Sequence, residues 1–190
     1  MKNLSVHIKS FQEISSEYEF TYRNIDVKTS FYNKLIANGR NVPSAGSYYS
    51  YSSLTEAREL RRKLKSEIDR KFTLELTSAF EAKLVYYFRN VLKRGYSLHS
   101  TYRSSVSGSV RIGGAHLMYH HLLDVFKQEI QPLNNVAYAN LKNLVDYRNW
   151  LAHGRGWDFE NHLSVFDFEY SYRTIEEIIK LLPNFPEKLK

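Results

Sequence analysis

The residue types best suited to chemistry stand together between Tyr147 and Arg155. Arg148 carries a guanidinium that stays protonated and favours an anion, and His153 carries an imidazole that exchanges a proton near neutral pH. Asn149 adds an amide, which lies one helical turn before His153 if the segment is helical. A fixed cation, an amide and a titratable ring suit the binding and cleavage of a phosphodiester.

A helix over residues 133–153 is predicted to position these groups. Pro132 precedes its start, where proline is tolerated, and Gly154 follows its end, where glycine is favoured. At about 100° per residue, one stripe of this helix is apolar, and Arg148 falls in the middle of the stripe. The apolar stripe consists of Ala137, Leu141, Leu144, Val145, Leu151 and Ala152.

Two interpretations of Arg148 follow from this position, because a guanidinium on a buried face needs an anion. The anion can be a carboxylate of the protein, for which Glu81 and Asp124 are candidates. Arg148 is then structural, and His153 is a cation favoured by the C-terminal dipole of the helix. Alternatively, the anion is a ligand phosphate and the cluster is a functional site. The residue types and their spacing are compatible with both interpretations.

The same segment resembles the signature of the HEPN superfamily, in particular its prokaryotic ribonuclease toxins and defence proteins. The resemblance rests on Arg148, four intervening residues and His153, with Asn149 after the arginine and Ala-His-Gly-Arg closing the helix. It implies an all-α domain that pairs with itself, so that Arg148 and His153 of two copies line one cleft. One position differs. In HEPN toxins modified by a partner nucleotidyltransferase, a tyrosine stands two residues after the histidine, where this chain has Arg155.

The resemblance implies a metal-independent endoribonuclease of toxin or defence type that needs no cofactor. The 2′-OH of RNA would be the nucleophile, with His153 as general base or acid, Arg148 stabilising the phosphorane and Asn149 orienting the phosphate or the histidine. Three further arginines are assigned to RNA binding: Arg103, Arg111 and Arg155. The expected partners are RNA, a second copy of the chain and an antitoxin protein. The alternative is a non-catalytic HEPN-like module that binds RNA, a nucleotide or a partner protein.

The whole chain is expected to form a single domain over residues 1–190, with 1–54 as a helical extension and 55–190 as the bundle. A net charge of +7 and an aromatic content of 15% favour a polyanionic partner. The absence of cysteine excludes disulfides and thiolate metal sites. Because no apolar run has membrane-spanning length and no signal peptide is evident, we expect a cytoplasmic protein without membrane contact.

Hydrophobic periodicity predicts an all-α bundle of about five helices with a long N-terminal helical segment. The predicted helices cover residues 4–38, 53–95, 115–130, 133–153 and 174–182. Capping-box patterns at Ser53 and Thr174 mark the starts of two of them. The Ser- and Gly-rich residues 96–114 are expected to form a long central loop, and residues 157–170 a loop with a short strand or hairpin.

Two further patterns have more than one interpretation. His116, His120 and Asp124 recur every four residues, a spacing that can hold a divalent metal, but no third strong ligand is identifiable. We therefore predict no metal site, and interpret this row as an interface or a solvated stripe. The charged run 58–63 is interpreted as a solvated face with local ion pairs, and an RNA-binding track is its alternative.

Overall fold

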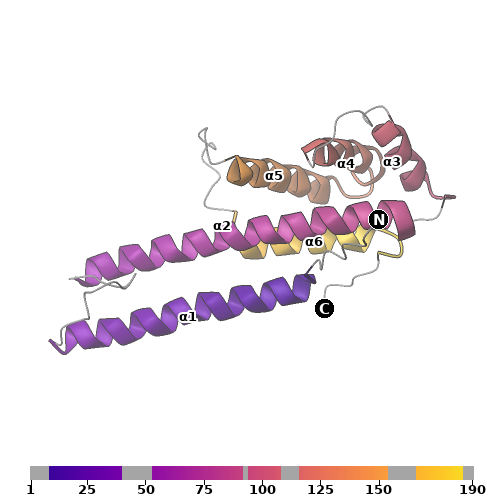
Figure 1. The fold of residues 1–190 in the computed structure, drawn as a ribbon. Helices are drawn as coiled ribbons and strands as arrows, with labels where there is room; N and C mark the ends of the chain where they lie inside the picture. Colours follow the sequence, from indigo (N-terminus) through magenta and orange to yellow (C-terminus); the bar gives the residue numbers. More distant parts are fainter. Residues whose placement is uncertain (1–8, 40–52, 92–93, 108–115, 154–165, 186–190) are drawn as a thin grey trace, which may run out of the picture.

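The computed structural model describes residues 9–39, 53–91, 94–107, 116–153 and 166–185, with the side chains at 89–90 and 105–121 left out. Every regular element in these ranges is a helix, which confirms the predicted all-α class (Figure 1). The helices are α1 (Phe11–Ala37), α2 (Leu54–Tyr86), α3 (Ser97–Ser107), α4 (His116–Glu129), α5 (Asn135–Ala152) and α6 (Phe168–Leu181). A π-helical turn, η1 (Tyr87–Val91), directly follows α2. None of the described helices is long and apolar enough to cross a membrane.

The ends of the two longest helices follow from their capping residues. Ser10 begins α1 through a capping box, in which its hydroxyl accepts from the backbone N–H of Glu13 and its own N–H donates to the Glu13 carboxylate. Gly39, with a φ of 64°, follows the end of α1 in the left-handed conformation that glycine favours. The Ser53 hydroxyl accepts from the N–H of Glu56 at 3.2 Å, so α2 begins as predicted.

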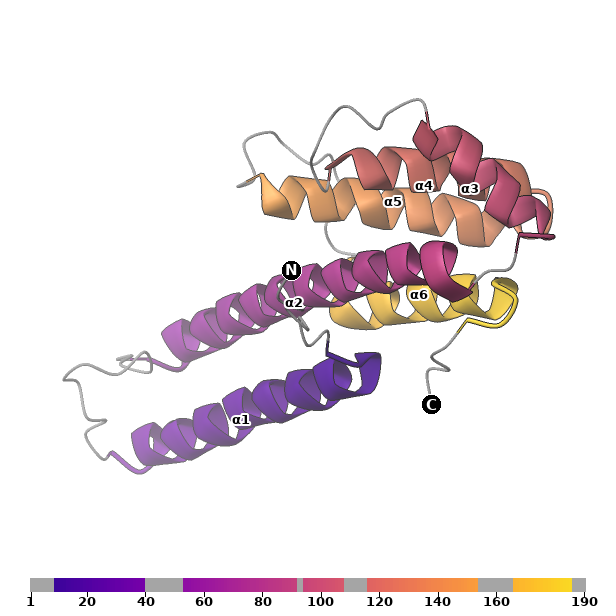
Figure 2. The ribbon, with the colours of Figure 1, turned by 45° about the vertical axis from the view of Figure 1, so that its right-hand side comes forward.

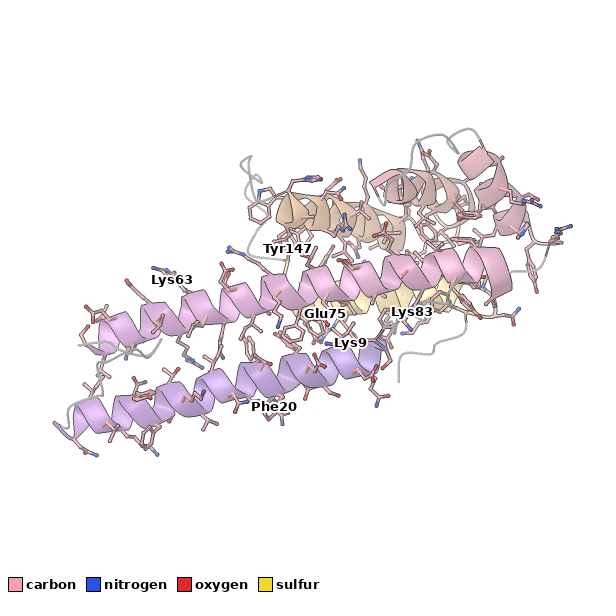
Figure 3. All side chains as sticks on the ribbon, in the orientation of Figure 1. Lys9, Phe20, Lys63, Glu75, Lys83 and Tyr147 are labelled. Carbon is pink, nitrogen blue, oxygen red and sulfur yellow. The ribbon has the colours of Figure 1, made fainter. Side chains whose placement is uncertain are left out.

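Helices α1 and α2 lie side by side as a long antiparallel hairpin (Figures 1 and 2). Polar bridges connect them, among which Lys9 Nζ lies 2.7 Å from the Glu75 carboxylate (Figure 3). The Tyr18 hydroxyl donates to Asp69 of α2 at 2.8 Å. Both ribbon views show one end of this hairpin extending beyond the other helices (Figures 1 and 2). The face of α1 that points away from α2 exposes apolar side chains such as Phe20, which is 70% exposed (Figure 3).

The main hydrophobic core forms where the second half of α2 packs against α4, α5 and α6. Its largest buried side chains are Phe11, Phe72, Phe80, Tyr87, Phe88 and Phe126. A second, smaller cluster contains Tyr147, Trp150 and Phe166, at the end of α5 and just before α6. The helix predicted to carry the reactive residues is therefore anchored by both clusters.

The predicted long central loop over residues 96–114 was wrong for residues 97–107, which form α3. Leu98 and Tyr102 lie one turn apart on this helix and are both buried. The Tyr102 ring stacks on that of Phe88 at 4.5 Å, and Thr101 donates to the carboxylate of Glu129 on α4. These tertiary contacts outweigh the weak helix propensity of the serines and threonine.

The predicted start of the last helix was also wrong. Helix α6 begins at Phe168, because the Asp167 carboxylate accepts the N–H of Tyr170 at 2.7 Å and acts as the N-cap. Thr174, which was predicted to be the cap, is buried inside the helix. Residues 168–170 are therefore helical and not part of a strand or hairpin, while residues 154–165 lie outside the described ranges.

Candidate functional site

Helix α5 positions the candidate reactive residues, and its ends agree with the predicted helix to within two residues. The Asn134 side chain caps the start by accepting the N–H of Ala137 at 2.9 Å. At the other end His153 is the C-cap, and its N–H donates to the carbonyl of Asn149. Of the predicted stripe, Ala137, Leu141, Leu144 and Val145 are buried, Leu151 is half-buried and Ala152 is exposed. The buried face shifts near the end because Trp150 packs into the second cluster.

Arg148 does face inward, and it pairs with a carboxylate of α2. Its Nη2 lies 3.3 Å from Oε2 of Glu81, and the two side chains are only 11% and 7% exposed. Its Nη1 donates to Oδ1 of Asn149 at 3.2 Å. Burial raises the pKa of the Glu81 carboxyl, while the guanidinium acts in the opposite direction. The ion pair anticipated for Arg148 thus forms with Glu81, whereas Asp124, the other candidate, is exposed on α4.

The geometry of this pair is looser than that of a strong charged hydrogen bond. A distance of 3.3 Å exceeds the roughly 2.7–2.9 Å usual between a cationic N–H and a carboxylate. The second carboxylate oxygen of Glu81, Oε1, is buried and has no hydrogen-bond partner among the described residues. Glu81 therefore neutralises the guanidinium without saturating its own hydrogen-bonding capacity.

His153 occupies a different environment from Arg148. Its side chain is exposed at the end of α5, one turn beyond the half-buried Asn149. The structure therefore brings Arg148 and Asn149 into contact and presents His153 to solvent at the same helix end. Arg103 is exposed on α3, and α3 lies at the opposite end of α5 from His153 (Figures 1 and 2). The other two arginines assigned to RNA binding, Arg111 and Arg155, lie outside the described side chains.

The candidate site therefore consists of a buried ion pair, an amide and an exposed imidazole at the end of one helix. No family model, curated protein or solved structure matches this chain. Function must consequently be inferred from these groups, from the charges around them and from the resemblance of the motif.

The alternative metal row on α4 is only partly described. The helix itself is confirmed, and Asp124 is exposed on it, but the side chains of His116 and His120 are outside the described set. Among the side chains that the structure does describe, no group of three or more His, Cys, Asp or Glu residues is placed to hold a metal ion.

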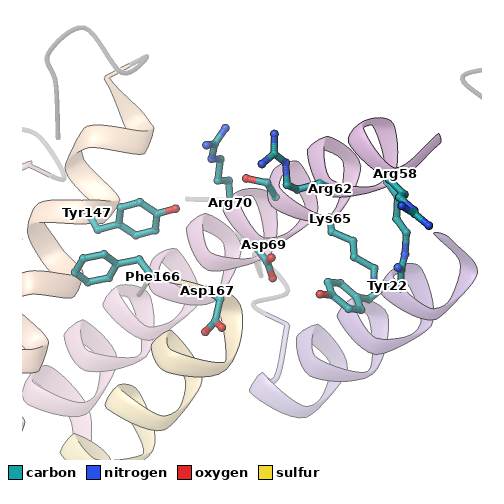
Figure 4. Close-up of a pocket in the computed structure, with 11 residues that line it drawn as sticks. Tyr22, Arg58, Arg62, Lys65, Asp69, Arg70, Tyr147, Phe166 and Asp167 are labelled. Carbon is teal, nitrogen blue, oxygen red and sulfur yellow. The ribbon is translucent and has the colours of Figure 1, made fainter. Parts of the chain in front are cut away.

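Sequence reasoning did not identify a groove that borders α5 on the hairpin side, which we call the basic groove (Figure 4). It has a volume of about 480 Å³ and is lined by five cationic side chains of α2: Arg58, Arg61, Arg62, Lys65 and Arg70. Three aromatic rings from distant parts of the chain also line it: Tyr22 on α1, Tyr147 on α5 and Phe166, two residues before α6. The charged run 58–63 was the available signal, but the aromatic residues come from distant segments.

Proposed function

We propose that this chain is a metal-independent endoribonuclease of the HEPN type, with a role in toxicity or defence, and that Arg148, Asn149 and His153 carry its chemistry. The observation that most supports the proposal is the buried guanidinium of Arg148, which lies near the same end of α5 as the exposed His153 imidazole. The carboxylate that pairs with this guanidinium, Glu81 of α2, is only loosely bound to it. A cation already desolvated in this way interacts strongly with phosphate charge.

The proposed reaction uses the 2′-OH of RNA as the nucleophile. His153 removes the proton from this hydroxyl as its oxygen attacks the adjacent phosphorus, and Arg148 stabilises the negative charge of the phosphorane. The bond to the 5′-oxygen of the next nucleotide then breaks, and this oxygen takes a proton from a second imidazole, that of a paired copy. The products are a 2′,3′-cyclic phosphate and a free 5′-OH.

Glu81 and Asn149 act on the arginine in this mechanism. Glu81 contacts Nη2 and Asn149 contacts Nη1, so both fix the plane of the guanidinium. Because the five N–H donors of arginine form a rigid fork, the fixed plane also sets the direction from which the guanidinium meets a phosphate. We therefore propose that Glu81 is a positioning residue.

The deciding assay is the treatment of a single-stranded RNA and of the DNA of the same sequence with purified protein in EDTA. We expect the RNA to be cut to products with 2′,3′-cyclic phosphate ends and the DNA to remain intact, because DNA lacks the 2′-OH. End-group analysis by mass spectrometry measures both. Cleavage of the DNA, or RNA cleavage that requires an added divalent metal, would rule out this mechanism.

A second prediction concerns pairing, because one His153 cannot be general base and general acid in the same step. We propose a symmetric homodimer joined around the α5 ends, in which both copies contribute Arg148 and His153 to one cleft. After subunit exchange, an excess of the His153→Ala variant added to the wild-type chain should then lower the cleavage rate, since each mixed dimer contains a single imidazole and lacks either the general base or the general acid. Cleavage rates of the wild-type chain with and without the added variant provide the measurement. A rate that the added variant leaves unchanged contradicts a shared site.

A non-catalytic HEPN-like module is the second candidate, and the Arg148–Glu81 ion pair favours it. An arginine neutralised by a protein carboxylate has a structural role without any ligand. Such a module would bind RNA, a nucleotide or a partner protein without turnover. Salt-dependent RNA binding with no cleavage over hours supports this candidate against the ribonuclease.

A further inference from the structure

The basic groove lies next to the proposed catalytic residues but does not contain them. Tyr147, which lines it, directly precedes Arg148 on α5 (Figure 4). From there the groove follows α2 from Arg70 to Arg58. These two arginines are twelve residues apart, which corresponds to about 18 Å of helix. The groove is therefore longer than a single nucleotide and has one end at α5.

The charges that line the groove are predominantly positive. Five cationic side chains face two carboxylates, those of Asp69 and Asp167. Both carboxylates already have local roles, because Asp69 accepts the Tyr18 hydroxyl at 2.8 Å and Asp167 caps α6. Neither of them neutralises a guanidinium of the groove through a described ion pair.

The five cations are not equally available. Arg61 and Lys65 both contact Asp26 of α1, at 2.6 and 2.7 Å, and Arg70 contacts Glu67 at 2.7 Å. Arg58 and Arg62 are exposed, and no described carboxylate pairs with them. They are four residues apart on α2, so about 6 Å of helix separates them on one face. This interval is comparable to the separation of successive phosphates on an extended strand.

Aromatic side chains line the groove at its α5 end and along α1. At the α5 end the rings of Tyr147 and Phe166 stack on each other at 4.8 Å and are 2% and 8% exposed, so they bound the groove, and the Tyr147 hydroxyl points into it (Figure 4). Further along α2, the Lys65 ammonium lies 4.0 Å from the centroid of the half-buried Tyr22 ring. Cationic side chains between aromatic surfaces are typical of sites for single-stranded nucleic acid, where phosphates follow the cations and bases contact the rings.

We propose that the basic groove binds the single strand of RNA next to the bond that is cut, with its phosphates along Arg62 and Arg58 and its path towards α5 bounded by Tyr147 and Phe166. The inference rests on the proposed ribonuclease function, since it treats the groove as an extension of that site. A strand contacts the protein at several phosphates there, whereas a mononucleotide fills only part of the length.

Binding of a fluorescent 2′-O-methyl RNA octamer to the wild-type chain tests this inference, because such RNA lacks the nucleophile and cannot be cut. The Arg58→Ala/Arg62→Ala double variant should bind it at least about 10-fold more weakly at 0.15 M salt, with the slope of log K against log salt reduced by about 1.4. The matched control is Arg23→Ala/Arg173→Ala, which removes two exposed cations outside the groove. The control should retain the wild-type affinity to within about 3-fold.

Three outcomes separate the groove from the catalytic proposal. If the wild-type chain cuts RNA, the double variant should raise the KM for the octamer sequence in unmodified RNA and leave kcat unchanged, which supports the groove. If the wild-type chain binds the octamer but cuts no RNA, the ribonuclease proposal is overturned. Loss of octamer binding in the double variant then still supports the groove as an RNA-binding site. Wild-type octamer binding by the double variant, or equal affinity for a mononucleotide, overturns the groove itself.

Discussion

Replacing His153 with alanine is expected to lower the rate of RNA cleavage by about 10²–10⁴-fold, the range that general acid–base catalysis contributes. The fold should remain intact, because the His153 side chain is exposed at the end of α5 and is not part of either hydrophobic cluster. Losing its interaction with the helix dipole should shift the unfolding midpoint by at most about 4 °C.

Single-turnover cleavage and thermal unfolding followed by circular dichroism measure the two effects. Lys142→Ala is a suitable control, since Lys142 is exposed on α5, about three turns before His153. This control should retain both the wild-type rate and the wild-type midpoint. A His153→Ala protein that cuts RNA at half the wild-type rate or faster would remove His153 from the mechanism.

The largest stability effect is expected for Arg148→Ala, which should lower the free energy of unfolding by about 3–5 kcal/mol. The variant leaves the buried carboxylate of Glu81 without its counter-charge. Arg148→Met combined with Glu81→Leu should recover most of this loss, because apolar residues of similar volume replace both buried charges. Urea unfolding of the two variants and of the wild-type chain gives these free energies.

The double variant also separates the two interpretations of Arg148. If Arg148 stabilises the phosphorane, the stable Arg148→Met/Glu81→Leu protein should cut RNA at least about 10²-fold more slowly than the wild-type chain. If the ion pair is only structural, the stable double variant should act like the wild-type chain. An Arg148→Ala protein whose unfolding free energy falls by less than about 1 kcal/mol would instead show that the pair contributes little to folding.

Local sequence signals predicted the helix of the candidate site well. Pro132 and Gly154 bounded α5 to within two residues, and the position of Arg148 on the apolar face predicted that it would need an anion. The choice of Glu81 could not be predicted, because it depends on how α2 packs against α5. The shift of the buried face towards Trp150 depends on Phe166, which lies beyond the helix in the sequence.

Errors arose where tertiary packing overrode composition. Residues 97–107 have the serine content of a loop, but Leu98 and Tyr102 are buried and the Tyr102 ring stacks on Phe88, so tertiary contacts stabilise a helix there. Thr174 has the spacing of a capping box, yet it lies inside α6. The basic groove combines α1, α2 and α5, so its aromatic walls were not evident from the charged run alone.

The extension of the α1–α2 hairpin beyond the bundle has a consequence for the free energy of local opening. In α2 only Ala57 is buried before Phe72, and in the second half of α1 only Ile25 and Thr29 are buried. This end of the hairpin therefore opens at a lower free energy than the core, without global unfolding. A strand that contacts Arg58 and Arg62 on α2 together with Tyr22 on α1 binds the closed hairpin alone, so part of its binding free energy offsets the cost of ordering this end.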